Sequence, residues 1–331
     1  MAATLSAILR QSLLIPGPAM TEEQLPDQRG KVHMITGGYS GIGYELAKML
    51  YDRNATVFLA GRDISKAKRA IQQIRAEQKT KTLGKLHYVY LDLADLHTIK
   101  SSVEDFLCRT DRLDVLVNNA GVMVPPAGSC TKQGHELQMG VNCLGPFLLA
   151  QLLLPILSRC AASSPAGSVR IIWTGSVATE LGRLAKLFSD EGKPAMIMDD
   201  QAQNYVLSKI GNIFLAAETA RRYGESTGLV SVAVNPGNLD TRLQRNMTWW
   251  QYGVARLLLF PAFLGAYTQL YAGWSDDITI ANNNGSYIWP WGRVGYLRKD
   301  LEEAVRPGSD GGSSLAAKFW SWCNETVSDY Q

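Results

Sequence analysis

The stretch Val32-His-Met-Ile-Thr-Gly-Gly-Tyr-Ser-Gly-Ile-Gly43 decides the fold class of this chain. Its first five residues form an apolar run typical of a buried strand, and a glycine-rich loop leads from them directly into a helical pattern. Glycine permits a tight turn and a close approach of the backbone to a pyrophosphate, which can rest on the N-terminus of the next helix. The three segments together predict a dinucleotide-binding unit.

Short apolar runs and helical patterns alternate along the rest of the chain. This alternation predicts an α/β fold, a doubly wound parallel sheet of about seven strands with helices on both faces. We expect strands at 32–36, 56–60, 86–91, 115–117, 169–173, 229–234 and 286–288, and helices near 42–53, 65–77, 96–108, 132–159 and 204–223. We also expect an N-terminal extension over 1–28 and a single domain over 29–331. The stretches 177–204 and 243–274 lack this rhythm and are candidates for a substrate lobe.

Composition indicates a soluble protein: of 331 residues, 46% are hydrophobic and 19% charged, with a net charge of +3. No basic cluster suggests a nucleic-acid partner. Five scattered cysteines without a Cys-x-x-Cys pair, with four histidines, predict free thiols and no metal site. Residues 1–16 and 257–267 are too short to span a membrane, so we expect a cytoplasmic protein, with organelle targeting as the alternative.

Arg62 bears on the choice of nicotinamide cofactor. A site for NAD usually has an acidic residue at the end of the second strand, and this chain has Ala60-Gly-Arg62 there. A guanidinium suits a 2′-phosphate, so we expect NADP(H). Asp63 weakens this expectation, the glycine loop adds no second basic residue, and a plain surface arginine is the alternative.

Tyr205 and Lys209 lie four residues apart in a predicted helix, 29 residues after Ser176. Residues i and i+4 share a helix face, so the ammonium is expected to lower the pKa of the phenol from about 10 toward the neutral range. Such a phenol can act as a general acid or base. Taken alone, the pattern also fits a surface helix with a long lysine.

Taken in their order along the chain, over about residues 28–300, these motifs resemble those of the short-chain dehydrogenase/reductase family in its single-domain form. The retinol-dehydrogenase-like and WW-domain-oxidoreductase-like members, especially fungal ones of this length, are the most similar. The resemblance implies a Rossmann-type fold and a nicotinamide cofactor. It assigns cofactor binding to Gly37, Tyr39, Ser40, Gly41, Ile42, Gly43, Arg62, Asp92, Leu93, Asn119, Ala120, Gly121, Tyr205, Lys209, Pro236, Gly237 and Thr241.

The resemblance also implies a role for each of four catalytic residues. Tyr205 would act as general acid in reduction and as base in oxidation, and Lys209 would tune the tyrosine and bind the nicotinamide ribose. Ser176 would polarise the carbonyl, and Asn142 would hold a water that connects Lys209 to solvent. Many relatives have Ser-Ser where this chain has Gly175-Ser176, but the required hydroxyl is present.

The substrate is expected to be a hydrophobic ketone or aldehyde, or the corresponding alcohol. Bulky residues supply candidate pocket walls: Trp249, Trp250, Tyr252, Phe260, Phe263 and Tyr267, with Pro126, Trp289 and Trp291 as further candidates. By analogy we expect a carbonyl reductase of secondary metabolism, with a retinal- or xenobiotic-type reductase as the alternative. A regulatory protein that binds NADPH without turnover is the alternative of another class. A homodimer is possible.

Overall fold

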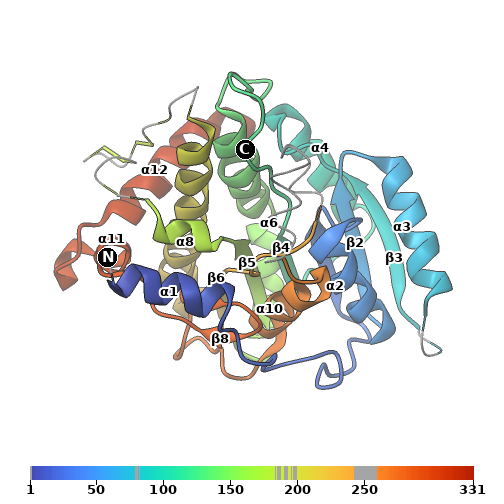
Figure 1. Ribbon diagram of the computed structural model, residues 1–331. Coiled ribbons are helices and arrows are strands. Elements are labelled where there is room, and N and C mark those ends of the chain that lie inside the picture. Colours follow the sequence, from blue (N-terminus) through green and yellow to red (C-terminus); the bar gives the residue numbers. More distant parts are fainter. Residues whose placement is uncertain are drawn as a thin grey trace.

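An eight-stranded sheet runs through the centre of the computed structural model, which describes residues 2–78, 81, 83–182, 184, 188–189, 193–194, 196, 200–241 and 259–331 (Figure 1). Within these residues the strand order is β3-β2-β1-β4-β5-β6-β7-β8, and every pair is parallel except β7 with β8. The strands are β1 (Val32–Thr36), β2 (Thr56–Gly61), β3 (Lys85–Tyr90), β4 (Val115–Asn118), β5 (Val169–Thr174), β6 (Leu229–Val234), β7 (Tyr287–Trp289) and β8 (Arg293–Val294).

Helices cover both faces of this sheet, and each layer encloses its own apolar core. One layer contains α2 (Gly41–Asp52), α3 (Ile64–Ala76) and α10 (Ala262–Trp274); in Figure 1, α2 and α10 lie side by side. The other contains α4 (Leu96–Leu107), α6 (Gly145–Ala162), α8 (Gln201–Thr227), α11 (Lys299–Val305) and α12 (Leu315–Val327). Because the central strands β1, β4, β5 and β6 are buried from both sides, most of their residues are apolar.

The structure confirms the α/β class, the doubly wound parallel sheet and all seven strands expected from the sequence, with ends shifted by at most one residue. The eighth strand, β8, is two residues long, which is too short for a sequence pattern. It pairs Val294 with Ile288 and closes one edge of the sheet.

One expected helix begins later than predicted. Instead of starting at residue 132, it begins with α5 (Leu137–Met139), passes through a π-helical turn η1 (Gly140–Leu144) and continues as α6. Gly134 adopts a positive φ of 80° in the turn before it, and the Glu136 carboxylate accepts a hydrogen bond from the backbone of Met139. These two local features hold residues 130–136 outside the helix.

Four α-helices of the described residues were not expected. They are α10 in the stretch without clear strand-helix alternation, α11 and α12 near the C-terminus, and α1 (Ala2–Ser12), which packs against the short 3-10 helix η2 (Val177–Glu180). The sequence of α10 is apolar or small on almost every side, so it lacks the polar face that reveals a surface helix. Two further 3-10 turns are η5 (Gly308–Asp310) and η6 (Ser328–Tyr330).

Among the described helices, one continuous segment, Leu137–Ala162, is long and apolar enough to cross a bilayer. However, 78% of its most apolar window is buried inside the fold, where it contacts α4, α8 and α12. This helix is therefore a core helix of the domain.

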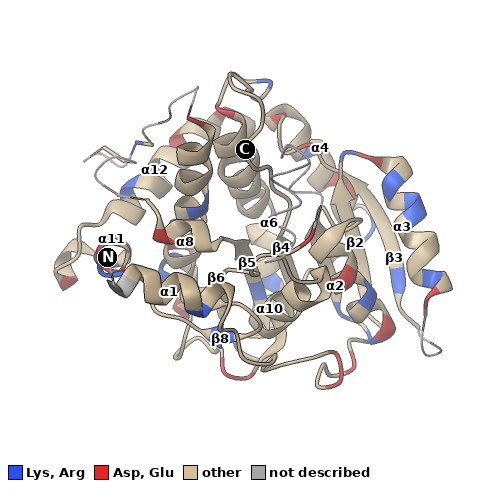
Figure 2. Ribbon diagram, in the orientation of Figure 1, with Lys and Arg blue, Asp and Glu red and all other residues tan. Residues whose placement is uncertain are grey.

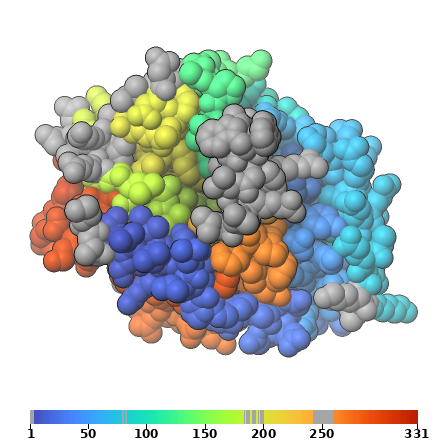
Figure 3. Space-filling model, in the orientation of Figure 1, coloured from blue at the N-terminus to red at the C-terminus, as the bar shows by residue number. Residues whose placement is uncertain are grey.

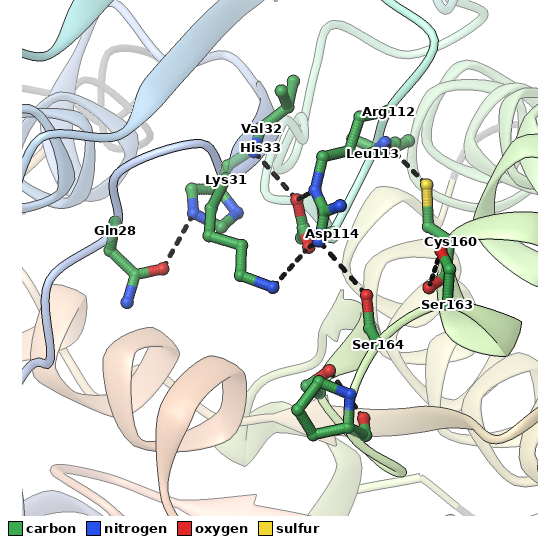
Figure 4. Close-up of polar contacts among 12 residues, drawn as sticks. Gln28, Lys31, Val32, His33, Arg112, Leu113, Asp114, Cys160, Ser163 and Ser164 are labelled. Atoms are coloured by element: carbon green, nitrogen blue, oxygen red, sulfur yellow. Dashed lines mark hydrogen bonds and ion pairs between the residues drawn. The ribbon is translucent and has the colours of Figure 1, made fainter.

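A charged cluster joins three strands at their amino ends, on the opposite side of the sheet from the glycine loop (Figure 4). Asp114, just before β4, has a side chain only 3% exposed. Its carboxylate accepts hydrogen bonds from Arg112 at 2.6 and 2.8 Å, from Lys31 at 3.1 Å and from the backbone of Val32 at 2.9 Å. Its backbone carbonyl accepts from the N–H of Arg170 in β5.

Burial alone would raise the pKa of Asp114, but the bonds from Arg112 and Val32 and the nearby positive charges hold it below its ordinary value. The carboxylate is therefore charged and fully paired. Removing one partner of a buried ion pair of this kind destabilises the fold strongly, because the remaining charge loses its compensation.

We predict that Asp114→Ala lowers the free energy of unfolding by about 3–5 kcal/mol, since it leaves Arg112 and Lys31 without their buried partner. As the control, Asp105→Ala removes an exposed pair with Arg109 and should cost less than about 1 kcal/mol. Urea unfolding measures both. The contribution of Asp114 to stability is present above about pH 4 and is lost as the pH falls through its folded-state pKa. Equal small losses of stability in the two variants would contradict the prediction.

Candidate active site

A cavity of about 990 Å³ opens at the carboxyl ends of β1, β2, β4, β5 and β6. In parallel sheets ligands bind in such a crevice, beside the point where the strand order reverses. In this sheet that point lies between β1 and β4. The glycine loop lines one part of the cavity, and Tyr205 with Ser176 lines another.

The glycine loop is shaped by close backbone contacts. Gly37 and Gly41 have positive φ angles of 66° and 55°, which favour glycine. A Cβ on Gly43 would lie 2.7 Å from Nδ2 of Asn119 and 2.9 Å from the carbonyl oxygen of Gly37, so no side chain fits there. The loop ends at Ser40, the N-cap of α2, and the start of α2 lines the cavity, where free N–H groups can hold an anion.

Thr36 joins this loop to the segment after β4. Its hydroxyl accepts hydrogen bonds from the N–H groups of Asn119 and Ala120, both at 2.9 Å, and lies 3.3 Å from the carbonyl oxygen of Val117. Gln269 of α10 donates to the Asn119 side chain at 3.0 Å. Sequence reasoning missed Thr36 and Gln269, because neither belongs to the motifs it used.

The residues after β2 form a second part of the cavity. Tyr39 lies against Gly61, where a Cβ would come within 2.5 Å of the tyrosine ring. Arg62 is exposed and lines the cavity together with Lys66 of α3, which sequence reasoning missed. Basic residues recur along α3, as Figure 2 shows. Asp63 caps α3 through the N–H of Lys66 and pairs with its ammonium at 2.6 Å.

The catalytic candidates lie where β5 ends. Tyr205 and Lys209 come from adjacent turns of α8, and Ser176 is the N-cap of η2. The Ser176 side chain lies close enough to Tyr205 to lower its pKa slightly. The Lys209 ammonium donates to the carbonyl oxygen of Thr174 at 2.8 Å and lies 5.6 Å from the centre of the Tyr205 ring.

The pKa of Tyr205 corrects an expectation from the sequence. Burial raises it to about 12, against the smaller effect of the Ser176 side chain. Burial also lowers the pKa of Lys209 to about 8. The expectation that Lys209 lowers the pKa of Tyr205 was therefore wrong. Both groups are buried, and the ammonium donates its hydrogen bond to the carbonyl oxygen of Thr174.

Asn142 lies in the π-helical turn η1 and does not line the cavity. Its side chain accepts from the N–H of Val122 at 2.8 Å and donates to the carbonyl oxygen of Val122 and to Ser208, both at 3.0 Å. Asn142 therefore supports the wall segment that contains Val122. Irregular helical turns of this kind are frequent at functional sites.

The loop after β6 closes the cavity on the side of α10. Gly237 has a φ of 91°, and its N–H donates to the side chain of Asn235 at 3.0 Å. Thr241 approaches the glycine loop, since a Cβ on Gly41 would lie 3.4 Å from its methyl group. Asn235 lines the cavity and was not expected from the sequence.

The structure thus brings nearly all of the expected site residues around one cavity; only Gly43 and Asn142 stand behind its lining. The expected aromatic wall is wrong where the structure describes it. Phe260, Phe263, Tyr267, Trp289, Trp291 and Pro126 do not line the cavity, and Trp249, Trp250 and Tyr252 lie outside the described residues. Among the described residues, the apolar side chains that line the cavity include Val122, Met123, Leu137, Val141, Ala178, Leu239 and Leu259.

The aromatic residues have other partners. Tyr267 donates to Glu22 at 2.7 Å, and Phe260 packs edge-to-face against Trp291.

Among the described residues, no three His, Cys, Asp or Glu side chains come together as a metal site.

Comparison with known proteins matches residues 31–251 to the family described as short chain dehydrogenase. A short-chain dehydrogenase/reductase of Phomopsis amygdali is 46% identical over 324 residues, covering 95% of this chain and 94% of its own. One of Pestalotiopsis fici is 40% identical, covering 96% and 97%.

Two solved structures extend the comparison to the fold. A Mycobacterium paratuberculosis protein has a TM-score of 0.65 at 27% identity, covering 93% of this chain and 97% of that one. A short chain dehydrogenase from Shigella flexneri, solved in complex with NADP, has a TM-score of 0.57 at 22% identity, covering 77% and 95%. At that identity the second likeness concerns the fold alone.

We predict that Gly43→Ala lowers the free energy of unfolding by about 1–3 kcal/mol, because the added methyl overlaps Gly37 and Asn119. In an open helix the same change would be stabilising. The control is Gly17→Ala, where a Cβ meets nothing within 4 Å and the effect should stay within about 0.5 kcal/mol. Urea unfolding decides, and a neutral Gly43→Ala would show that the loop has room.

Proposed function

The chain belongs to the short-chain dehydrogenase/reductase family, and within it we propose an NADP(H)-dependent reductase that converts a hydrophobic ketone or aldehyde to the alcohol, or the reverse. One observation carries the proposal. Tyr205 and Ser176 line the same cavity as the glycine loop. This supports a proton donor beside a site for a dinucleotide.

The residues of the cavity fit a nicotinamide dinucleotide. Gly37, Gly41 and Gly61 line the cavity, where a Cβ would meet Ala120, Thr241 or Tyr39, so these glycines let the surrounding segments pack closely; α2 begins at the cavity wall. Residues Ser40 to Ile42 would hold the pyrophosphate, Asp92 and Leu93 the adenine, and Pro236, Gly237 and Thr241 the nicotinamide. The cofactor supplies the hydride; the chain supplies binding, orientation and the proton.

The preference for NADP(H) rests on the end of β2. Arg62 and Lys66 are two positive groups at the cavity, while the Asp63 carboxylate is occupied by Lys66 and by the cap of α3. This arrangement favours a 2′-phosphate over a ribose hydroxyl. Solved short chain dehydrogenases of this fold in complex with NADP and with NADPH agree with it.

The raised pKa of Tyr205 suits the direction of reduction. At neutral pH the phenol keeps its proton and can donate it to the oxygen of the carbonyl substrate as negative charge develops there. The Ser176 hydroxyl, turned toward the substrate, would donate a second hydrogen bond to the same oxygen. Lys209, whose pKa of about 8 lies near neutral, would bind the nicotinamide ribose and help to restore the proton.

Asn142 would complete the site as the residue that holds a water between Lys209 and solvent. The same cavity has apolar side chains such as Val122, Met123 and Leu239 in its lining, which favours a hydrophobic substrate. By analogy, the proposal extends to a carbonyl reductase of secondary metabolism, a cytoplasmic enzyme with a single catalytic domain over 29–331 that forms a homodimer.

We predict that the protein oxidises NADPH in the presence of at least one hydrophobic aldehyde or ketone, and that Tyr205→Phe lowers this turnover by about 10²–10⁴ with NADPH binding nearly intact. Absorbance of NADPH across a carbonyl panel and fluorescence titration measure the two quantities. Tyr90→Phe, at an exposed tyrosine, is the control. Tight NADPH binding without oxidation of any panel member would favour a regulatory protein instead.

We further predict that Arg62→Ala weakens NADPH binding by about tenfold or more and changes NADH binding little, because it removes a charged hydrogen-bond donor to the 2′-phosphate. Arg75→Ala, at an exposed arginine of α3 outside the cavity lining, should change neither. Equal losses for both cofactors would show that Arg62 does not read the phosphate.

A further inference from the structure

The N-terminal helix α1 reaches the two loops that form the catalytic end of the cavity. It packs against η2, the short helix that starts at Ser176. In Figure 3 the residues of α1, in dark blue, form a surface patch adjoining α10, in orange. The carbonyl oxygen of Arg10, near the end of α1, accepts a hydrogen bond from Arg293 of β8 at 3.1 Å, which ties the helix to the edge of the sheet.

Gln11 makes the polar connection. Its side chain is 0% exposed, although it comes from a helix at the molecular surface. Its Nε2 donates to Oε1 of Glu180 at 3.1 Å, and its Oε1 accepts from Nδ2 of Asn235 at 2.9 Å. The two partners follow 169 and 224 residues later in the chain.

Each partner belongs to a loop with a task in the proposed reaction. Glu180 ends η2, whose first turn holds Ser176 through the N–H of Ala178. Asn235 precedes Pro236 and accepts from the N–H of Gly237, so the amide of Gln11 is two hydrogen bonds away from the loop assigned to the nicotinamide. Ser176, Ala178, Asn235 and Gly237 all line the cavity, whereas Gln11 does not.

We propose that Gln11 is a positioning residue, which sets the catalytic Ser176 turn at a fixed distance from the Pro236–Gly237 loop and thereby aligns the carbonyl with the nicotinamide. This inference rests on the proposed function. Alignment of reacting groups is sensitive, since a misplacement of about 1 Å can lower a rate by about 10²-fold.

As long as its partners are the Glu180 carboxylate and the Asn235 amide, the residue at position 11 must carry an amide. Glu180 is 5% exposed, and a carboxylate there needs a donor, while the Asn235 amide needs an acceptor. Glutamine supplies both from one rigid planar group. Methionine, with a similar length, supplies neither, and glutamate would place two carboxylates side by side.

The test compares Gln11→Met and Gln11→Glu with the exchanged pair Gln11→Glu/Glu180→Gln. In the pair, the carboxylate now at position 11 accepts from the amide now at position 180 and from Asn235. The connection is thereby restored with the amide and the carboxylate exchanged. Gln72→Met, at an exposed glutamine of α3, is the matched control.

We expect each single variant at position 11 to lower kcat by about 10- to 100-fold, with the affinity for 2′,5′-ADP unchanged. That ligand represents the adenosine half of the cofactor and does not reach the Gln11 loops. Hydrogen exchange of segments 174–181 and 234–240 should speed up about tenfold. The exchanged pair should recover both kcat and the slow exchange.

Three results would overturn the inference: wild-type kcat and exchange in Gln11→Met, loss of 2′,5′-ADP binding in parallel with kcat, or failure of the exchanged pair to recover. If Gln11→Met does not fold, the exchanged pair and Gln11→Glu still decide. If the wild-type protein reduces no carbonyl, the proposed function fails, and hydrogen exchange alone tests whether Gln11 holds the two loops.

Discussion

The structure of the site depends on one close approach. The glycine loop after β1 and the Asn119–Ala120 segment after β4 lie so near each other that a Cβ on Gly43 or Gly37 would meet Asn119 or Ala120 within 2.7–3.4 Å. Thr36 joins the two segments, because its hydroxyl accepts hydrogen bonds from the backbone N–H groups of Asn119 and Ala120. Because this contact sets where α2 begins, it also sets where a phosphate can bind, and the rest of the cavity is arranged around that point.

Burial then decides the acid-base properties of the site. Tyr205 and Lys209 are both nearly inaccessible, so each is pushed toward its neutral form: the phenol holds its proton and the ammonium loses it more easily. The protonated phenol and the lysine with a pKa near neutrality support the proposed reduction of an uncharged carbonyl. The same residue types on an exposed helix face would have neither property.

The N-terminal segment acts on this site through the fold. Met20 and Leu25 are buried against the layer of α2 and α10, and Gln11 is buried between the Ser176 turn and the Pro236–Gly237 loop. These contacts join N-terminal residues to residues far along the chain, and a local pattern cannot contain them. Gln269 likewise supports the cavity only because α10 brings it to Asn119, 150 residues earlier in the chain.

By itself, the sequence determined the seven parallel strands, the family and the candidate site residues, nearly all of which the structure brings around one cavity. Strands buried on both faces must be apolar, and close backbone approach admits only glycine, so both leave a local signal. Only the tertiary structure decided the pKa direction of Tyr205, the apolar residues that line the cavity, and the places of α1 and α10. These follow from burial and from contacts between residues far apart in the chain, and neither property has a period or a motif.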